Sequence, residues 1–119
     1  MLLLCYPKCT TCQKAKKYLE DAGIAYRERN IKEENPTYDE LCEWVEKSGL
    51  PTKKFFNTSG LLYRSMGLSE RLPAMSDEER LRLLATDGML VKRPLLISGE
   101  KVLVGFREKE WESLGQRSE

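Results

Sequence analysis

The sequence contains no histidine, and this absence limits the chemistry that its other side chains can perform. Without imidazole there is no Cys-His nucleophile pair, no histidine metal ligand and no histidine general base. Any reactive cysteine must therefore be activated by cations, by backbone dipoles or by both.

The chain also lacks an excess of charge of either sign and any long apolar segment. Its 20 Lys and Arg residues nearly balance its 19 Asp and Glu residues, so no large basic field attracts nucleic acid or a membrane surface. The apolar start, Met1 to Tyr6, is not preceded by the basic segment of a signal peptide, and no apolar run approaches the ~20 residues of a membrane span. We therefore expect one cytoplasmic domain over residues 1–119, with no direct nucleic-acid or membrane partner.

Cysteine is scarce and unevenly placed. Cys5, Cys9 and Cys12 lie close together near the start, and no cysteine follows Cys42. This spacing is a poor disulfide framework but is typical of a redox or metal site. Cys5 falls in an apolar run and Cys42 on an apolar helical stripe, so we expect both to be structural.

Hydrophobic patterning predicts a strand, a helix and a second strand at the start of the chain. Residues 1–6 form an apolar run, residues 10–22 repeat small and apolar side chains at helical spacing, and residues 24–30 alternate apolar with charged side chains. The first run is typical of a strand buried on both faces, and the alternation is typical of an edge strand. Two parallel strands joined by a helix form a right-handed βαβ unit.

The rest of the chain predicts a helical insertion followed by a hairpin. Residues 36–87 carry helical stripes and turn signals, whereas residues 95–97 and 102–104 flank Ser-Gly-Glu as hairpin strands. A short helix from about Glu108 should end the domain, with residues 115–119 fraying.

The motif Cys9-Thr10-Thr11-Cys12 lies where the first strand meets the first helix. Unpaired backbone N–H groups and the helix dipole at that point favour an anion, and therefore a thiolate. Two cysteines separated by two residues can close a disulfide across one helical turn, and Lys8 adds positive charge. Next to a βαβ unit, this motif indicates a thioredoxin-like redox site.

Arg93-Pro94 directly precedes the expected hairpin, where thioredoxin-like folds place a cis-proline facing the cysteine motif. An X-Pro bond prefers trans by only about 0.5 to 1 kcal/mol. We therefore expect a cis bond at Pro94, close to Cys9.

A metal centre is a competing interpretation of the cysteines. Cys5, Cys9 and Cys12 have the spacing of the iron-sulfur loop of radical enzymes that use S-adenosylmethionine. However, 119 residues cannot form the barrel of those enzymes. A zinc or iron-sulfur site would also require Cys42 to leave its helical stripe as fourth ligand.

Taken together, these motifs resemble the arsenate reductase/Spx-type family of thioredoxin-like proteins. The matching segments, which span nearly the whole chain, are YPKCTTCQKAKKYLE, FNTSGLLYRSMGL and KRPLLISGEKVLVGFREKEW. The resemblance implies a thioredoxin-like (glutaredoxin-like) α/β fold, with a four-stranded mixed sheet and an inserted helical subdomain. The central segment is most similar to the reductase-like branch, whereas the Cys-x-x-Cys motif resembles that of the Spx regulators.

The resemblance also implies roles for individual residues. Cys9 matches the nucleophile, and Arg93 and Arg107 match arginines that bind the oxyanion in glutaredoxin-coupled arsenate reductases, as guanidinium groups do in a fixed fork. Gly60 stands where those reductases carry a further arginine, and Arg64 is the nearest candidate substitute. The expected catalytic residues are Cys9, Cys12 and Arg93; the expected substrate-binding residues are Lys8, Thr10, Thr11, Arg64, Arg93, Pro94 and Arg107; no metal ligand is expected.

Two functions from different classes follow from the resemblance. In the first, the protein is a thiol-dependent reductase: Cys9 attacks an oxyanion or a disulfide, and Cys12 or glutathione resolves the adduct. Glutathione with glutaredoxin, or thioredoxin, supplies electrons as co-substrate, and no cofactor is bound. In the second, the protein is an Spx-type redox-sensing regulator that binds the C-terminal domain of the RNA polymerase α subunit.

Overall fold

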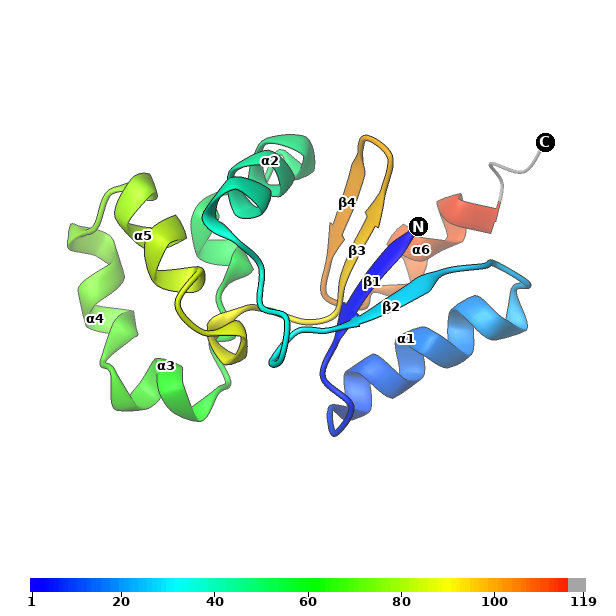
Figure 1. Cartoon of the computed structure of the whole chain (residues 1–119), viewed down its shortest axis with the longest axis horizontal. Helices are drawn as coiled ribbons and strands as arrows, with labels where there is room; N and C mark the ends of the chain where they lie inside the picture. Colours follow the sequence, from blue (N-terminus) through cyan, green and yellow to red (C-terminus); the bar gives the residue numbers. More distant parts are fainter. Residues whose placement is uncertain (116–119) are drawn as a thin grey trace.

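The computed structural model describes residues 1–115 and centres on a mixed sheet of four strands (Figure 1). The strands are β1 (Leu2–Cys5), β2 (Arg27–Asn30), β3 (Leu95–Ser98) and β4 (Lys101–Val104), in the order β2-β1-β3-β4. β1 pairs in parallel with β2 and antiparallel with β3, which pairs antiparallel with β4. This arrangement confirms the expected four-stranded mixed sheet and the βαβ unit.

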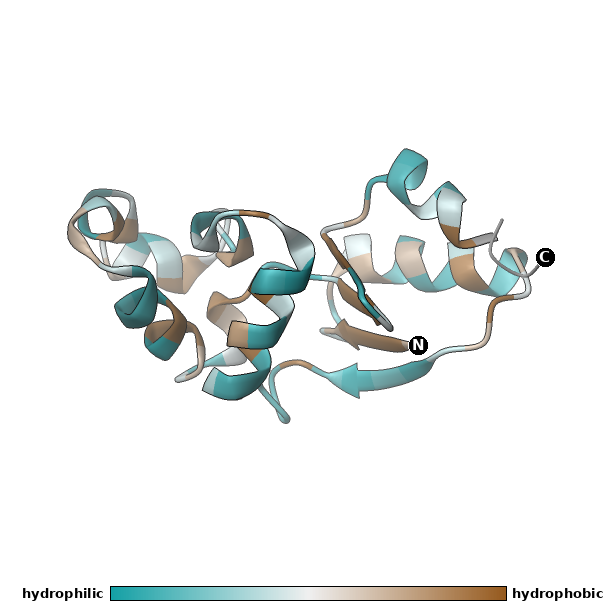
Figure 2. Cartoon of the chain, turned by 90° about the horizontal axis from the view of Figure 1, so that it is seen from above, coloured by the Kyte–Doolittle hydropathy of each residue, from teal (hydrophilic) through white to brown (hydrophobic). Residues whose placement is uncertain are grey.

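Helices cover both faces of the sheet. α1 (Thr10–Asp21) and α6 (Glu108–Gly115) lie on one side, and the helical insertion lies on the other (Figures 1 and 2). The insertion comprises α2 (Tyr38–Ser48), η1 (Thr52–Phe55), α3 (Leu61–Ser65), α4 (Leu68–Arg71), η2 (Leu72–Ala74) and α5 (Asp77–Leu84), and the 3-10 turn η3 (Gly88–Leu90) follows it. None of the helices in the described part is long and apolar enough to cross a membrane.

Successive residues of β1 enter different cores because side chains alternate between the faces of a strand. Leu4 packs with the helical insertion, whereas Leu3 and Cys5 pack with Cys12 of α1 and Trp111 of α6. All five side chains are buried. The sheet therefore joins the two cores, and the end of β1 is held from both sides.

Local signals account for the long helices of the insertion. Thr37 and Ser76 each accept a hydrogen bond from the backbone three residues on, and Glu40 and Glu79 each accept one from the backbone of the cap residue. These are capping boxes, which satisfy N–H groups that have no partner within the helix. Gly49 ends α2 in the left-handed conformation, with a φ of 69°.

The expected start of β2 at residue 24 was wrong by three residues. The Ile24 N–H still donates to the Leu19 carbonyl at the end of α1, and Ile24 and Tyr26 pack against the core that contains Cys12. Pairing with β1 begins only at Arg27. Of the residues expected to fray, Gly115 ends α6, and residues 116–119 lie outside the described part.

Gly88 fixes the distance between η3 and the chain that leaves β2. A Cβ at this position would lie 1.7 Å from the Ile31 carbonyl oxygen and 2.7 Å from its carbon. Both atoms belong to the main chain, so the backbone would have to move to admit a methyl group.

We predict that Gly88→Ala lowers the free energy of unfolding by about 2–3 kcal/mol, the scale of an overpacking substitution. Gly60→Ala is the matched control, because its closest contact is the movable Asn57 side-chain amide, at 2.9 Å. Urea unfolding followed by circular dichroism compares the two variants. An unchanged midpoint for Gly88→Ala would contradict the prediction.

Candidate active site

The turn between β1 and α1 presents Cys9 at the N-terminus of the helix. Cys9 is the N-cap residue of α1, and its side chain makes no capping hydrogen bond. Its N–H donates to the Tyr6 carbonyl at 2.9 Å, and its carbonyl accepts from Gln13 N–H at 3.1 Å. Gln13 Nε2 also donates to the Pro7 carbonyl at 2.7 Å. The turn is thus fixed by backbone contacts, while the Cys9 thiol remains available for reaction next to the positive end of the helix dipole.

The cysteines of this region differ in their accessibility. Cys9 is half-buried, whereas Cys5 and Cys12 are fully buried, and all are free thiols. A large substrate can therefore reach Cys9 but not Cys12. Of the two cysteines in the Cys-x-x-Cys motif, Cys9 is therefore the more accessible thiol.

Cys12 lies in an environment that stabilises its thiolate. A hydrogen bond from the Cys5 thiol lowers the pKa of Cys12, in opposition to burial, and the Tyr6 N–H, the Cys9 thiol and the charge of Arg93 act in the same direction. The Tyr6 N–H lies 3.4 Å from Cys12 Sγ. The same contact with Cys12, together with burial, raises the pKa of Cys5. The proton therefore stays on Cys5, and the thiolate forms on Cys12.

Arg93 is the cation of the site. Its Cζ lies 5.2 Å from the centre of the Tyr6 ring, and its peptide bond to Pro94 is cis, as expected. Nε and Nη1 of Arg93 are buried and make no hydrogen bond with the described residues. A half-buried guanidinium with two buried, unused donors is suited to an anion, because leaving these donors unpaired is costly.

The other expected substrate-binding residues lie in different places. Lys8, Thr10 and Thr11 are exposed on the cysteine turn and the first helical residues. Pro94 is buried, and its carbonyl accepts the Gly105 N–H at 2.8 Å.

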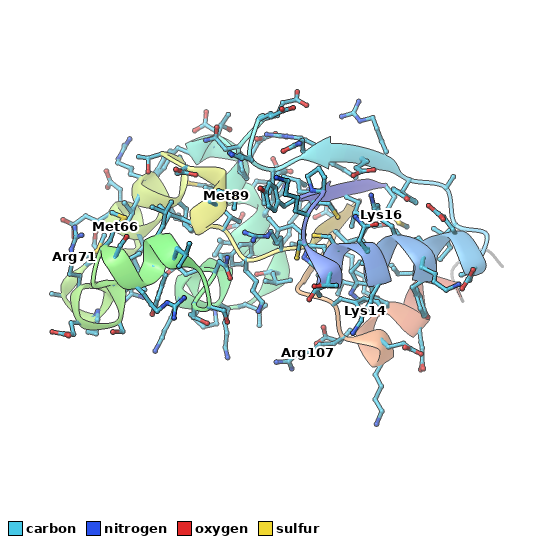
Figure 3. All side chains as sticks on the ribbon, turned by 90° about the horizontal axis from the view of Figure 1, so that it is seen from below. Lys14, Lys16, Met66, Arg71, Met89 and Arg107 are labelled. Carbon is cyan, nitrogen blue, oxygen red and sulfur yellow. The ribbon has the colours of Figure 1, made fainter. Side chains whose placement is uncertain are left out.

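The two remaining arginines are both exposed. Arg107 precedes α6 and extends away from the ribbon (Figure 3), and it lines a cavity together with Lys92 and Gly105. Arg64 lies on α3, and its side chain makes no hydrogen bond or ion pair within residues 1–115, so no described contact joins it to the cysteines.

Two residues of the site escaped the sequence analysis. Tyr6 contributes its carbonyl, its N–H and its ring to Cys9, Cys12 and Arg93, respectively. Cys5, expected to be structural, is buried as expected but also contacts the Cys12 thiol. The one available signal was position, because Tyr6 and Cys5 directly precede the cysteine turn.

No group of three or more Cys, Asp or Glu side chains is arranged to hold a metal ion within the part of the chain that the structure describes. The geometry here offers thiols and a guanidinium instead. Such a set can perform thiol-disulfide exchange or attack an anion held by the guanidinium.

Comparison with known proteins places this geometry in a family context. Residues 4–114 match the model of the ArsC family. The uncharacterized protein YusI of Bacillus subtilis (strain 168) is 57% identical over 107 residues, which cover 90% of this chain and 91% of that protein. A structure from Bacteroides fragilis, described as a putative ArsC family related protein, has a TM-score of 0.94 and 56% identity, with 95% of each chain covered.

Two further matches carry functional descriptions. The structure of a possible arsenate reductase from Streptococcus mutans UA159 has a TM-score of 0.85 and 43% identity, covering 93% of this chain and 96% of that one. The global transcriptional regulator Spx of Staphylococcus saprophyticus is 28% identical over 104 residues, covering 87% of this chain and 78% of the regulator. The match to the family model spans nearly the whole chain, and the chain therefore belongs to the ArsC family of thioredoxin-like proteins.

Proposed function

We propose that the protein is a thiol-dependent reductase in which Cys9 is the nucleophile, Cys12 the resolving thiol and Arg93 the anion-binding group. The observation that carries this proposal is Arg93, whose buried Nε and Nη1 have no hydrogen-bond partner in the described residues. Arg93 is connected through Tyr6 to both cysteines. We place the activity in the cytoplasm, where protein thiols are kept reduced.

With a disulfide as substrate, the thiolate of Cys9 attacks one sulfur and the other leaves as a thiolate. Cys12 then attacks Cys9 Sγ, which releases the second half of the substrate and leaves a Cys9–Cys12 disulfide. Two electrons have passed to the substrate. Thioredoxin, or glutathione with glutaredoxin, returns them and regenerates both thiols. The lowered pKa of Cys12 supports the second step, because the attacking species is its thiolate.

With an oxyanion such as arsenate, Cys9 displaces an oxygen as water and forms a bond to arsenic. Attack on Cys9 Sγ by Cys12 or glutathione then leaves the electron pair on arsenic, giving arsenite. Arg93 and Arg107 would bind the oxyanion. Gly60 has no side chain that could add a third cation around the oxyanion, and Arg64 makes no described contact with the cysteines. We therefore expect weak arsenate reduction.

The alternative function is a redox-sensing regulator that binds the C-terminal domain of the RNA polymerase α subunit. The 28% identity to an Spx regulator supports it. In that role the Cys9–Cys12 pair reports oxidation rather than catalysing reduction. Catalytic turnover separates the two functions, because a sensor needs none.

We predict that Arg93→Ala and Arg107→Ala each lower kcat/KM for arsenate by about tenfold or more, the scale of losing about 1.4 kcal/mol of charge-assisted binding. Arg27→Ala, on the opposite edge of the sheet, is the control for the loss of one charge. Gly60→Arg should raise the weak parent activity modestly. Steady-state assays with each thiol reductant measure these effects.

Reduction of a neutral disulfide should suffer less than arsenate reduction in the same arginine variants. Robust arsenate turnover by the parent, unaffected in Arg64→Ala, would show that two arginines suffice and that no third one is needed at the position of Gly60. Negligible turnover with both substrates would favour the sensor.

A further prediction concerns pH. Cys5→Ala removes the hydrogen bond that contributes most to the lowered pKa of Cys12. The pKa of Cys12 should therefore rise, and closure of the Cys9–Cys12 disulfide should require higher pH. Stopped-flow release of thionitrobenzoate from the mixed disulfide at Cys9 measures closure against pH. Cys5→Ser keeps a hydrogen-bond donor, so its closure rate should depend on pH more nearly as in the parent. Cys42→Ala, the control, should show the same pH dependence as the parent. An unchanged profile for Cys5→Ala would contradict the assigned role of Cys5.

A further inference from the structure

A basic groove runs along the free edge of the sheet. A cavity of about 580 Å³ is lined by β4 together with residues of η1, the segment before β3 and the start of α6. A neighbouring cavity of about 440 Å³ shares Ser48, Val102 and Leu103 with it and continues toward Glu100 at the hairpin tip. We call these two cavities the basic groove.

The floor of the basic groove is the backbone edge of β4. Val102, Leu103 and Val104 all line the larger cavity, although successive side chains of a strand point to opposite faces. Three consecutive residues can share one cavity only where it follows the edge of the strand. In the described sheet β4 pairs with β3 alone, so its outer edge can accept another strand.

The larger cavity of the groove has four cations on three segments of the chain. Lys53, Lys54, Lys92 and Arg107 line the larger cavity, and none of them forms an ion pair within residues 1–115. Glu110 is the one carboxylate in the lining of that cavity. The groove therefore combines free strand-pairing groups with a surplus of positive charge.

Charged residues often protect edge strands from pairing, but such residues sit on the strand itself. Here the one charged residue of β4, Lys101, donates to Ser113 Oγ of α6, and the four cations of the larger cavity lie outside β4. Pairing of β4 with β4 of a second copy would bring two sets of these cations together, which like-charge repulsion disfavours. An acidic segment would instead be attracted by these cations.

We propose that the basic groove binds an extended acidic segment of a partner protein, which adds to β4 as a fifth strand. Backbone hydrogen bonds to β4 would supply affinity, and carboxylates facing the four cations would supply selectivity. The Gly105 N–H, at one end of the groove, donates to the carbonyl of Pro94, next to Arg93. A segment bound in the groove would therefore hold its protein near the cysteine site, whether that site acts as catalyst or as sensor.

The test uses a fluorescein-labelled octapeptide of alternating valine and glutamate, with fluorescence anisotropy of the full chain as readout. We expect saturable binding that weakens with added salt and weakens at least about tenfold in Lys53→Glu/Lys54→Glu, the scale of placing like charges across an interface. Arg27→Glu/Lys32→Glu makes the same change in net charge near the other edge strand and should bind as the parent does.

Two further peptides test the strand geometry. Methylation of alternate backbone nitrogens of the same peptide, on the side that faces β4, should abolish binding, and an alternating valine-lysine peptide should not bind. Hydrogen exchange should slow in β4 when the acidic peptide is added.

Absence of binding up to millimolar peptide, equal loss in both charge-reversed variants, or full binding by the methylated peptide would overturn the proposal. A dimer of the free protein in sedimentation experiments, with β4 protected, would assign the edge to a second copy instead. Because Cys9→Ser should leave peptide binding unchanged, these outcomes are independent of the redox function.

Discussion

The site depends on the turn that joins the end of β1 to the start of α1, and Tyr6 is its centre. One residue accepts the Cys9 N–H, donates to Cys12 Sγ and supports the Arg93 guanidinium with its ring. The two cysteines and the cation are therefore held by a residue that takes no part in the chemistry. The buried strand β1 directly precedes Tyr6 and fixes its side of these contacts.

The sheet explains how so small a chain can hold this turn in place. Alternate residues of β1 enter the two cores, so the strand that leads to Tyr6 is packed on both faces. The helical insertion and the α1–α6 layer lie on opposite faces of the sheet (Figure 2). Packing on both faces gives the rigid support on which an exposed loop carries reactive groups.

The sequence was sufficient to predict features that local chemistry determines. The junction at Cys9, the cis bond before Pro94 and the β3–β4 hairpin all follow from motifs of a few residues, and all are found. The start of β2 was missed because Ile24 is bound to the end of α1. The contact of Cys5 with Cys12 and the meeting of Lys53 with Arg107 in one groove depend on how distant segments pack. Spacing along the chain cannot reveal such contacts.

The central claim is that Cys9 is the accessible nucleophile of a site whose cation is Arg93, and competitive alkylation tests it most directly. Brief treatment with iodoacetamide or with anionic iodoacetate at neutral pH, followed by mass spectrometry, gives the labelling rate of each cysteine. We predict that Cys9 reacts first with both reagents, ahead of Cys42, which is also half-buried, and of the buried Cys5 and Cys12. The ratio of iodoacetate to iodoacetamide labelling at Cys9 should fall in Arg93→Ala, because the guanidinium attracts the anion. Preferential labelling of Cys42, or a ratio at Cys9 that is unchanged without Arg93, would contradict the account.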